Sequence, residues 1–166
     1  MADVTGDFYA GDAFIGYGAE FRIGQNDGSP ETFTAVPDVN SIVPGDATTG
    51  TVDTTHLRSL NRHRERKLTL RDSGPFTLNC NYRPDHGAHL SAGGDGFSAT
   101  YNLPKLWENC TEFNFEIELP ADAGSPAIVM SGRGGITRYQ VGELSVDGKV
   151  PVTVEVTPLR DYDRGV

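Results

Sequence analysis

The chain has 166 residues, a formal net charge of −9 and 37% hydrophobic residues, with 20 glycines and 10 prolines. This length fits one domain with a real core, and the composition favours strands and turns over a helical bundle. No run of about 18 apolar residues occurs, which argues against a transmembrane helix, and the acidic N-terminus lacks the pattern of a secretory signal. We therefore expect a protein that is made and used in a cytoplasm, or assembled there and exported whole.

The charges are distributed unevenly along the chain. Residues 1–55 carry nine acids and one base, residues 56–72 carry six bases and two acids, and residues 73–166 carry twelve acids and seven bases. The three segments therefore have net charges of −8, +4 and −5. A basic island in an acidic chain can bind an anionic ligand or an acidic face of another copy, and it can also be a solvated loop. It lacks the interleaved aromatic residues that nucleic-acid binding would use.

Residues 1–17 form an arm rich in glycine and aspartate. The arm contains five large apolar residues. Because exposure of such side chains to water is unfavourable, we expect the arm to pack on another surface. These residues are Phe8, Tyr9, Phe14, Ile15 and Tyr17.

Short strands are predicted in the first half of the chain. Phe21 and Ile23 alternate with polar residues, and Phe33–Val36 is a second short strand that ends at a proline. Residues 37–66 are expected to be a long loop with one short strand at Val39–Val43. Such a long excursion in a compact domain usually has a function.

Two alternating runs follow the basic island. Lys67–Asp72 and Phe76–Tyr82 are joined by Asp72-Ser73-Gly74, which predicts a hairpin because glycine at a turn can take a positive φ. Leu68 and Leu70 then share one face of the first strand. The second strand has an apolar face and a polar face, formed respectively by Phe76, Leu78, Cys80 and Tyr82 and by Thr77, Asn79 and Asn81.

The second half predicts one helix and four further strands. The helix lies within residues 84–110, with Pro104 in its first turn, and Thr111–Leu119 is the clearest strand. Strands over 127–133 and 136–146 are separated by glycines, and a turn at Asp147-Gly148 leads to the final strand, which carries four alternating valines. Eight or nine short strands with one helix predict a mainly β fold, a sandwich or a barrel.

Candidate chemistry in the sequence is weak. His86 and His89, with Asp85 beside them, are the best metal candidate, but a zinc site normally needs a third protein ligand, and surface histidines are the simpler interpretation. Cys80 and Cys110 are interpreted as buried, reduced thiols. Because no nucleophile elbow, phosphate loop or dinucleotide motif is present, we predict no enzyme, no catalytic residue, no metal and no cofactor.

The order of the motifs resembles the major tail tube proteins of long, non-contractile-tailed bacteriophages. The resemblance rests on Thr51-Val-Asp-Thr-Thr-His-Leu, Arg64-Glu-Arg, Leu70-Arg-Asp-Ser-Gly-Pro-Phe-Thr-Leu and Asn81-Tyr-Arg-Pro-Asp, and it covers roughly residues 18–158. Two departures are the Thr69-Leu70 pair, where the family usually has a glycine, and a longer segment between Tyr82 and Phe113.

The resemblance implies a β-sandwich or half-barrel of two packed sheets with one flanking helix, similar to the type VI secretion tube protein. It implies a structural subunit that assembles with itself into rings, usually hexameric, stacked as a tube with an acidic channel through which DNA passes without specific binding. Tape measure, tail terminator and distal tail or baseplate proteins would be its further partners, with no membrane insertion. Such a protein is located in the virion tail and assembled in the host cytoplasm.

Two alternatives remain open at this stage: the tube of a contractile injection or secretion system, and a monomeric β-sandwich module that binds a ligand. Under the tail tube interpretation, residues 1–166 are one domain with an arm (1–17), an inter-subunit loop (37–66) and a tail (159–166). Candidate contacts between subunits or rings are Asp53, Thr55, His56, Arg58, Arg62, Arg64, Glu65, Arg66 and Lys67. Candidate channel-lining residues are Thr77, Asn79 and Asn81 on one strand and Glu112, Glu116 and Glu118 on another.

Overall fold

The computed structural model describes residues 18–56, 58, 64–121, 127–146, 148–160 and 163. These residues form a mainly β fold with one short helix and two sheets, as the sequence predicted. The elements are β1 (Glu20–Gly24), β2 (Phe33–Ala35), β3 (Val39–Val43), β4 (Ala47–Asp53), β5 (Arg66–Ser73), β6 (Phe76–Asn81), α1 (Leu103–Glu108), β7 (Glu112–Leu119), β8 (Ile128–Val141) and β9 (Pro151–Pro158).

The larger sheet has seven antiparallel strands in the order β2-β1-β7-β8-β9-β6-β3. Three strands separate β1 from β6 in this order, yet the rings of Phe21 on β1 and Phe76 on β6 have centroids only 5.8 Å apart. Phe115 on β7 packs against both rings, with its centroid 4.9 Å from that of Phe76. The sheet therefore curls around its own apolar face into a half-barrel.

Alternation along the strands supplies the core of the half-barrel. On β6 the apolar face predicted from the sequence is the buried one, with Phe76, Leu78 and Cys80 almost fully enclosed. The valines of β9 and the aromatic residues of β7 alternate in the same way. Each large apolar side chain that is fully buried stabilises the fold by about 1.5–3 kcal/mol, so this single cluster specifies the curl of the sheet.

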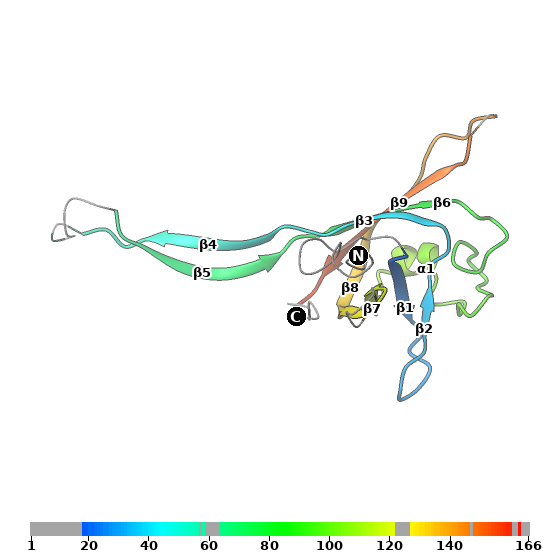
Figure 1. Cartoon of the computed structure of the whole chain (residues 1–166), viewed down its shortest axis with the longest axis horizontal. Helices are drawn as coiled ribbons and strands as arrows, with labels where there is room; N and C mark the ends of the chain where they lie inside the picture. Colours follow the sequence, from blue (N-terminus) through cyan, green and yellow to red (C-terminus); the bar gives the residue numbers. More distant parts are fainter. Residues whose placement is uncertain are drawn as a thin grey trace, which may run out of the picture.

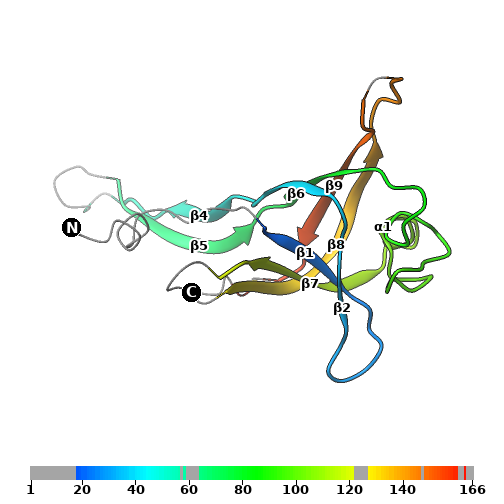
Figure 2. The same cartoon turned by 45° about the vertical axis from the view of Figure 1, so that its right-hand side comes forward.

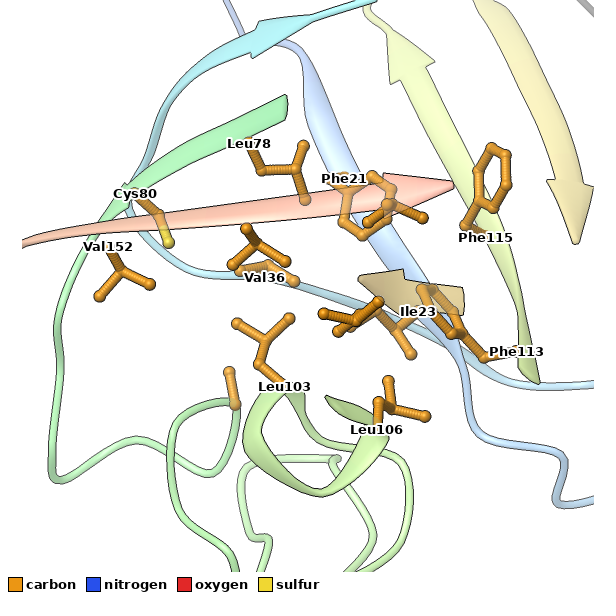
Figure 3. Packing of buried hydrophobic residues seen from close by; sticks show 14 of the residues in the cluster. Phe21, Ile23, Val36, Leu78, Cys80, Leu103, Leu106, Phe113, Phe115 and Val152 are labelled. Atoms are coloured by element: carbon orange, nitrogen blue, oxygen red, sulfur yellow. The ribbon is translucent and has the colours of Figure 1, made fainter. Parts of the chain in front are cut away.

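Helix α1 covers one end of the half-barrel, in the region where the sequence predicted it. Leu103 and Leu106 point from the helix into the core, as Figure 3 shows, and both are fully buried. Asn102 caps the helix, because its side chain accepts a hydrogen bond from the backbone N–H of Lys105 at 3.1 Å. Pro104 lies in the first turn, where its missing N–H costs nothing.

Strand β8 corrects the prediction of two strands separated by glycines. It is one strand of 14 residues, with an irregularity between Ile136 and Arg138. A Cβ added to Gly134 would lie 3.1 Å from Val156 and 3.3 Å from the ring of Phe115. This glycine therefore makes room for a core aromatic ring and does not interrupt the strand.

The predicted hairpin between Lys67–Asp72 and Phe76–Tyr82 is wrong. β5 pairs with β4, whereas β6 pairs with β3 and β9. The chain passes almost straight from β5 into β6, and β3 leads into β4 alongside it, so the two pairs form one long hairpin that crosses from one sheet to the other (Figure 1). Residues 37–66, expected to be mostly loop, thus contain β3 and the whole of β4.

Candidate assembly surfaces

The second sheet is the β4–β5 hairpin, which projects from the half-barrel in both views (Figure 1, Figure 2). Gly45 and Gly74 face each other at its base. A Cβ on Gly45 would overlap the backbone of Gly74 and lie 2.6 Å from the carbonyl oxygen of Pro75. The N–H of Gly74 donates to the carbonyl oxygen of Asp46 at 2.9 Å. This close crossing of two backbones fixes the point at which the hairpin leaves the half-barrel.

The predicted sharing of one face by Leu68 and Leu70 does not follow from the register of the hairpin. A bulge in β5 breaks the alternation, so Leu68 lies on the same face as Arg71, and Lys67 lies on the opposite face. Leu68 and Leu70 are nevertheless 77% and 87% exposed. A sheet of only two strands is marginally stable alone, and large exposed apolar residues close together usually mark a contact surface. We call the exposed surface of Leu68 and Leu70 the leucine face.

Short-range contacts order the described part of the hairpin tip. Asp53 accepts a hydrogen bond from the N–H of Thr55 at 2.8 Å, and hydrogen bonds from Thr55 hold the pKa of this carboxyl group below its usual value. The N–H of Thr54 donates to the carbonyl oxygen of Glu65 at 2.8 Å. Nε2 of His56 lies 3.8 Å from a carboxylate oxygen of Glu65. These contacts link the two described chain segments next to the tip, residues 53–56 and Glu65.

The structure brings most of the predicted contact residues together at this far end of the hairpin. Arg66 lies opposite Asp53 in the strand register, and Glu65 bonds to Thr55 across the hairpin. Arg62 lies outside the described residues. The described members of the set are Asp53, Thr55, His56, Arg58, Arg64, Glu65, Arg66 and Lys67.

The two sets of candidate channel residues lie on one surface. Thr77 on β6 lies opposite Glu155 on β9, and Glu112 on β7 lies opposite Gly135 on β8. In both strands the intervening residues point into the core. Thr77, Asn79, Asn81, Glu112, Glu116 and Glu118 therefore all lie on the outer face of the seven-stranded sheet, which we call the polar face.

Arginines on β1 and β8 partly neutralise the negative charge of the polar face. Arg22 pairs with Glu118 and, at 3.0 Å, with Glu20. Salt bridges between exposed groups of this kind contribute little to stability, typically less than about 1 kcal/mol each. Their main effect is on the charge of the polar face. Among the described residues of this face the glutamates outnumber the arginines, so the face is negative overall but carries charges of both signs. Two further pairs are Arg133–Glu112 at 3.0 Å and Arg138–Glu155 at 3.3 Å.

The seven-stranded sheet has two edges. Among the described residues, β2 pairs only with β1, and β3 pairs only with β6. An unpaired strand edge presents backbone donors and acceptors that can pair with another chain. The subunit therefore has two different edges through which copies could join.

Known structures provide the comparison that decides the fold. The chain is similar to the tail of an empty gene transfer agent particle, refined with C6 symmetry, at a TM-score of 0.64 and 14% identity, over 93% of this chain and 100% of that one. It is also similar to the SPP1 tail tube, at a TM-score of 0.60 and 11% identity, over 93% of this chain and 80% of that one. The chain has the tail tube fold. A third similar structure is the sheath/tube terminator of the extracellular contractile injection system PVC. The TM-score is 0.62 and the identity 14%, over 91% of this chain and 96% of that one.

These similarities are visible in structure alone. No protein-family model matches the sequence, and a search of curated proteins finds no match either. Within the described ranges, no helix of this tail tube fold is both long and apolar enough to cross a membrane.

His89 departs from the expectation of surface histidines. It is 5% exposed, its Nδ1 lies 3.2 Å from the hydroxyl oxygen of Tyr139, and its Nε2 has no hydrogen-bond partner among the residues that the structure describes. Burial, with a smaller contribution from the neighbouring His86, lowers its pKa to about 4. His86 instead accepts a hydrogen bond from the N–H of Ala88. The two histidines therefore do not converge, and the described residues contain no group of three or more potential metal ligands.

The two cysteines occupy different environments, so the prediction that both are buried is wrong for one of them, Cys110. Cys80 is buried in the core, and burial raises the pKa of its thiol to about 11. Cys110 is exposed at the end of α1, in a positive-φ conformation. Both thiols are free.

Two features of this tail tube fold were missed in the sequence. The sequence analysis did not predict the exposure of Leu68 and Leu70, although charged residues lie on both sides of this segment, which indicates exposure. An apolar groove between β1 and β3 was also missed. It is built from strands far apart in the chain, so no local pattern marks it.

Proposed function

We propose that this chain is a structural subunit, not an enzyme, that assembles with itself into the tube of a phage-like tail. The observation that carries this proposal is the match of nearly the whole chain to tail components, combined with a hairpin that exposes apolar side chains far from the core. A solitary protein would gain nothing from such a hairpin. An assembled one would cover it.

Rings of six copies would form by contact between the two different edges of the seven-stranded sheet. A contact of one patch with a different patch is head-to-tail, and such contacts generate closed rings. The β2 edge of one subunit would meet the β3 edge of the next, which removes the exposed strand edges that a monomer carries. The sixfold symmetry of the similar gene transfer agent tail favours six copies.

Stacking of the rings would use the β4–β5 hairpin. Its leucine face would be buried against the neighbouring ring, and the cations at its tip, including Arg64 and Arg66, would meet acidic groups of that ring. The strong charge asymmetry of the sequence favours this role, because a basic tip and an acidic remainder attract each other between copies.

The polar face would line the channel. Its glutamates exceed its arginines, and it carries the threonine and asparagines of β6, so DNA phosphates would meet a hydrated, weakly repelling wall. DNA would then pass without specific binding. Tape measure, tail terminator and distal tail or baseplate proteins would be the further partners, in a virion tail assembled in the host cytoplasm.

A second candidate is the tube of a contractile injection system. The fold also matches chains from the PVC sheath-tube complex and from the anti-feeding prophage baseplate, at TM-scores of 0.57 and 0.64. Such a tube would bind a sheath along its outer surface, whereas the tube of a non-contractile tail would not. Co-sedimentation of assembled tubes with sheath protein distinguishes the two candidates.

Negative-stain electron microscopy of the purified protein tests the proposal. We expect rings or tubes of uniform diameter with a central channel, either for the protein alone or after tail initiation proteins are added. A protein that stays monomeric at high concentration under both conditions would contradict self-assembly.

A further inference from the structure

The half-barrel is open along one seam. A groove of about 480 Å³ lies there, between the start of β1, the length of β3, the end of β7 and the start of β8. We call it the seam groove. Gly18, Ile42, Leu119 and Met130 contribute to its walls, and Phe76 and Ile117 contribute to its floor. The two floor residues are 1% and 4% exposed, so the groove reaches down to the core itself.

The seam groove suits apolar side chains. Among the described residues that line it, only Asn40 and Ser41 have polar side chains, and both side chains bond to β6. Asn40 donates to Asn81 at 3.0 Å, and Ser41 accepts from Asn79 at 2.9 Å. None of these described lining residues is charged. Cavities of about 300–1,000 Å³ hold drug-sized ligands, and this groove is therefore large enough for two or three large side chains.

The chain supplies a matching segment at the rim. Gly18, the first described residue, lines the groove, so the segment of residues 1–17 joins the described fold at the rim of the groove. Gly18 has φ +83°, a conformation that glycine adopts easily and that turns the chain at this point. The ten preceding residues include four aromatic ones and one isoleucine: Phe8, Tyr9, Phe14, Tyr17 and Ile15.

We propose that the seam groove is the binding site of the N-terminal arm of the same chain. Aromatic side chains from residues 8–17 fill the space above Phe76 and Ile117 and close the seam of the half-barrel. Ten extended residues span about 33 Å, which is enough for any of these side chains to reach along the groove. The inference does not rest on the proposed tube, because an isolated subunit contains both the arm and the groove.

Tethering favours the arm over an occupant from another copy. A segment joined to the rim by a few residues has an effective local concentration in the millimolar range. The leucine face of a second copy is the main competitor, but it must reach the groove by diffusion. At low protein concentration the arm therefore occupies the groove.

Disulfide trapping tests this proposal in the full-length chain. Cys110→Ser removes the exposed thiol, and Phe14→Cys is combined with Met130→Cys in the groove. The control combines Phe14→Cys with Gln140→Cys, which lies on the same strand as Met130 but is exposed at the polar face. Both proteins are oxidised at low micromolar concentration, and the products are separated on non-reducing gels and identified by mass spectrometry.

We expect the groove pair to form an intramolecular disulfide at least tenfold faster than the control pair. Equal rates would overturn the proposal, as would a groove pair that forms mainly dimers. If circular dichroism shows that Met130→Cys does not fold, Leu119→Cys takes its place. As a second readout, deletion of residues 2–17 should raise the fluorescence of the apolar dye ANS several-fold, and unchanged fluorescence would contradict the arm as occupant. Both readouts are made on monomers, so their failure is distinguishable from a failure to form tubes.

Discussion

Leu68 and Leu70 allow folding and assembly to be separated. Both are more than three-quarters exposed, so replacing both with serine removes little buried surface from the isolated subunit. Substitutions at such positions usually change the free energy of unfolding by no more than about 0.5 kcal/mol each. We therefore expect the Leu68→Ser, Leu70→Ser double variant to fold and melt almost as the parent protein does.

Assembly should respond much more strongly to the same change. Full burial of a leucine is worth about 1.5–3 kcal/mol, and most of the surface of both side chains is free to be buried against a neighbouring ring. The loss per hairpin is then about 2–5 kcal/mol, and each 1.4 kcal/mol corresponds to about a tenfold change in an association constant. At the lower limit, the protein concentration required for tube formation should rise at least about 30-fold.

Sedimentation of assembled material over a concentration series measures this effect, with thermal unfolding by circular dichroism as the check on folding. Thr69→Ser, at the position between the two leucines in β5, keeps a hydroxyl group, so it is the matched control and should behave as the parent protein. Leu78→Ala, in the core at 1% exposed, should instead lower the free energy of unfolding by about 2–5 kcal/mol. A leucine double variant that assembles at the parental concentration would refute the role of the leucine face.

Three further predictions follow from the junction, the tip and the buried histidine. Gly45→Ala forces a Cβ into the facing backbone and should destabilise the fold by about 1–3 kcal/mol, whereas Gly135→Ala, with nothing within 4 Å of the added Cβ, should be neutral in the same thermal unfolding assay. Arg64→Glu with Arg66→Glu should weaken tube formation in sedimentation without changing the melting temperature, and the parental tubes should weaken as salt screens this contact. Because the folded-state pKa of His89, about 4, lies below its ordinary value of 6.5, the free energy of unfolding should fall by up to about 3 kcal/mol as the pH drops from 6.5 to 4, and His89→Gln should reduce that slope in denaturant titrations.

Each of these predictions has an outcome that contradicts it. Equal stability of the two glycine variants would mean that the junction can relax around a methyl group. Normal assembly of the charge-reversed variant would remove the tip cations from the interface. An unchanged slope in His89→Gln would place the acid sensitivity of the fold elsewhere.

Local patterns were sufficient to predict the core strands. The alternation in β6, β7 and β9 correctly indicated which side chains are buried, because each of these strands has one face on the core and one in solvent. The helix was predicted from Pro104 and the residues around it. These signals lie within a few residues of each other, and the packing of one half-barrel agrees with them.

Strand pairing could not be predicted in the same way. Ser73-Gly74-Pro75 has the composition of a tight turn, but the glycine serves a crossing with Gly45, nearly thirty residues earlier in the chain. The choice between turn and crossing depends on the pairing of β3 and β4, whose sequences VNSIV and ATTGTVD show no clear alternation of apolar and polar residues. The sequence likewise could not show that the two sets of channel candidates share one surface, because only the sheet order shows that β6 and β7 belong to one sheet.

A cryo-electron microscopy reconstruction of assembled tubes would locate both the hairpin and the polar face. We predict stacked rings in which the β4–β5 hairpin of each subunit reaches the next ring, buries Leu68 and Leu70 there, and leaves the polar face, with Asn79 and Glu116, toward the channel. A reconstruction in which the hairpin remains in solvent, or in which the polar face lies on the outside of the tube, would contradict it.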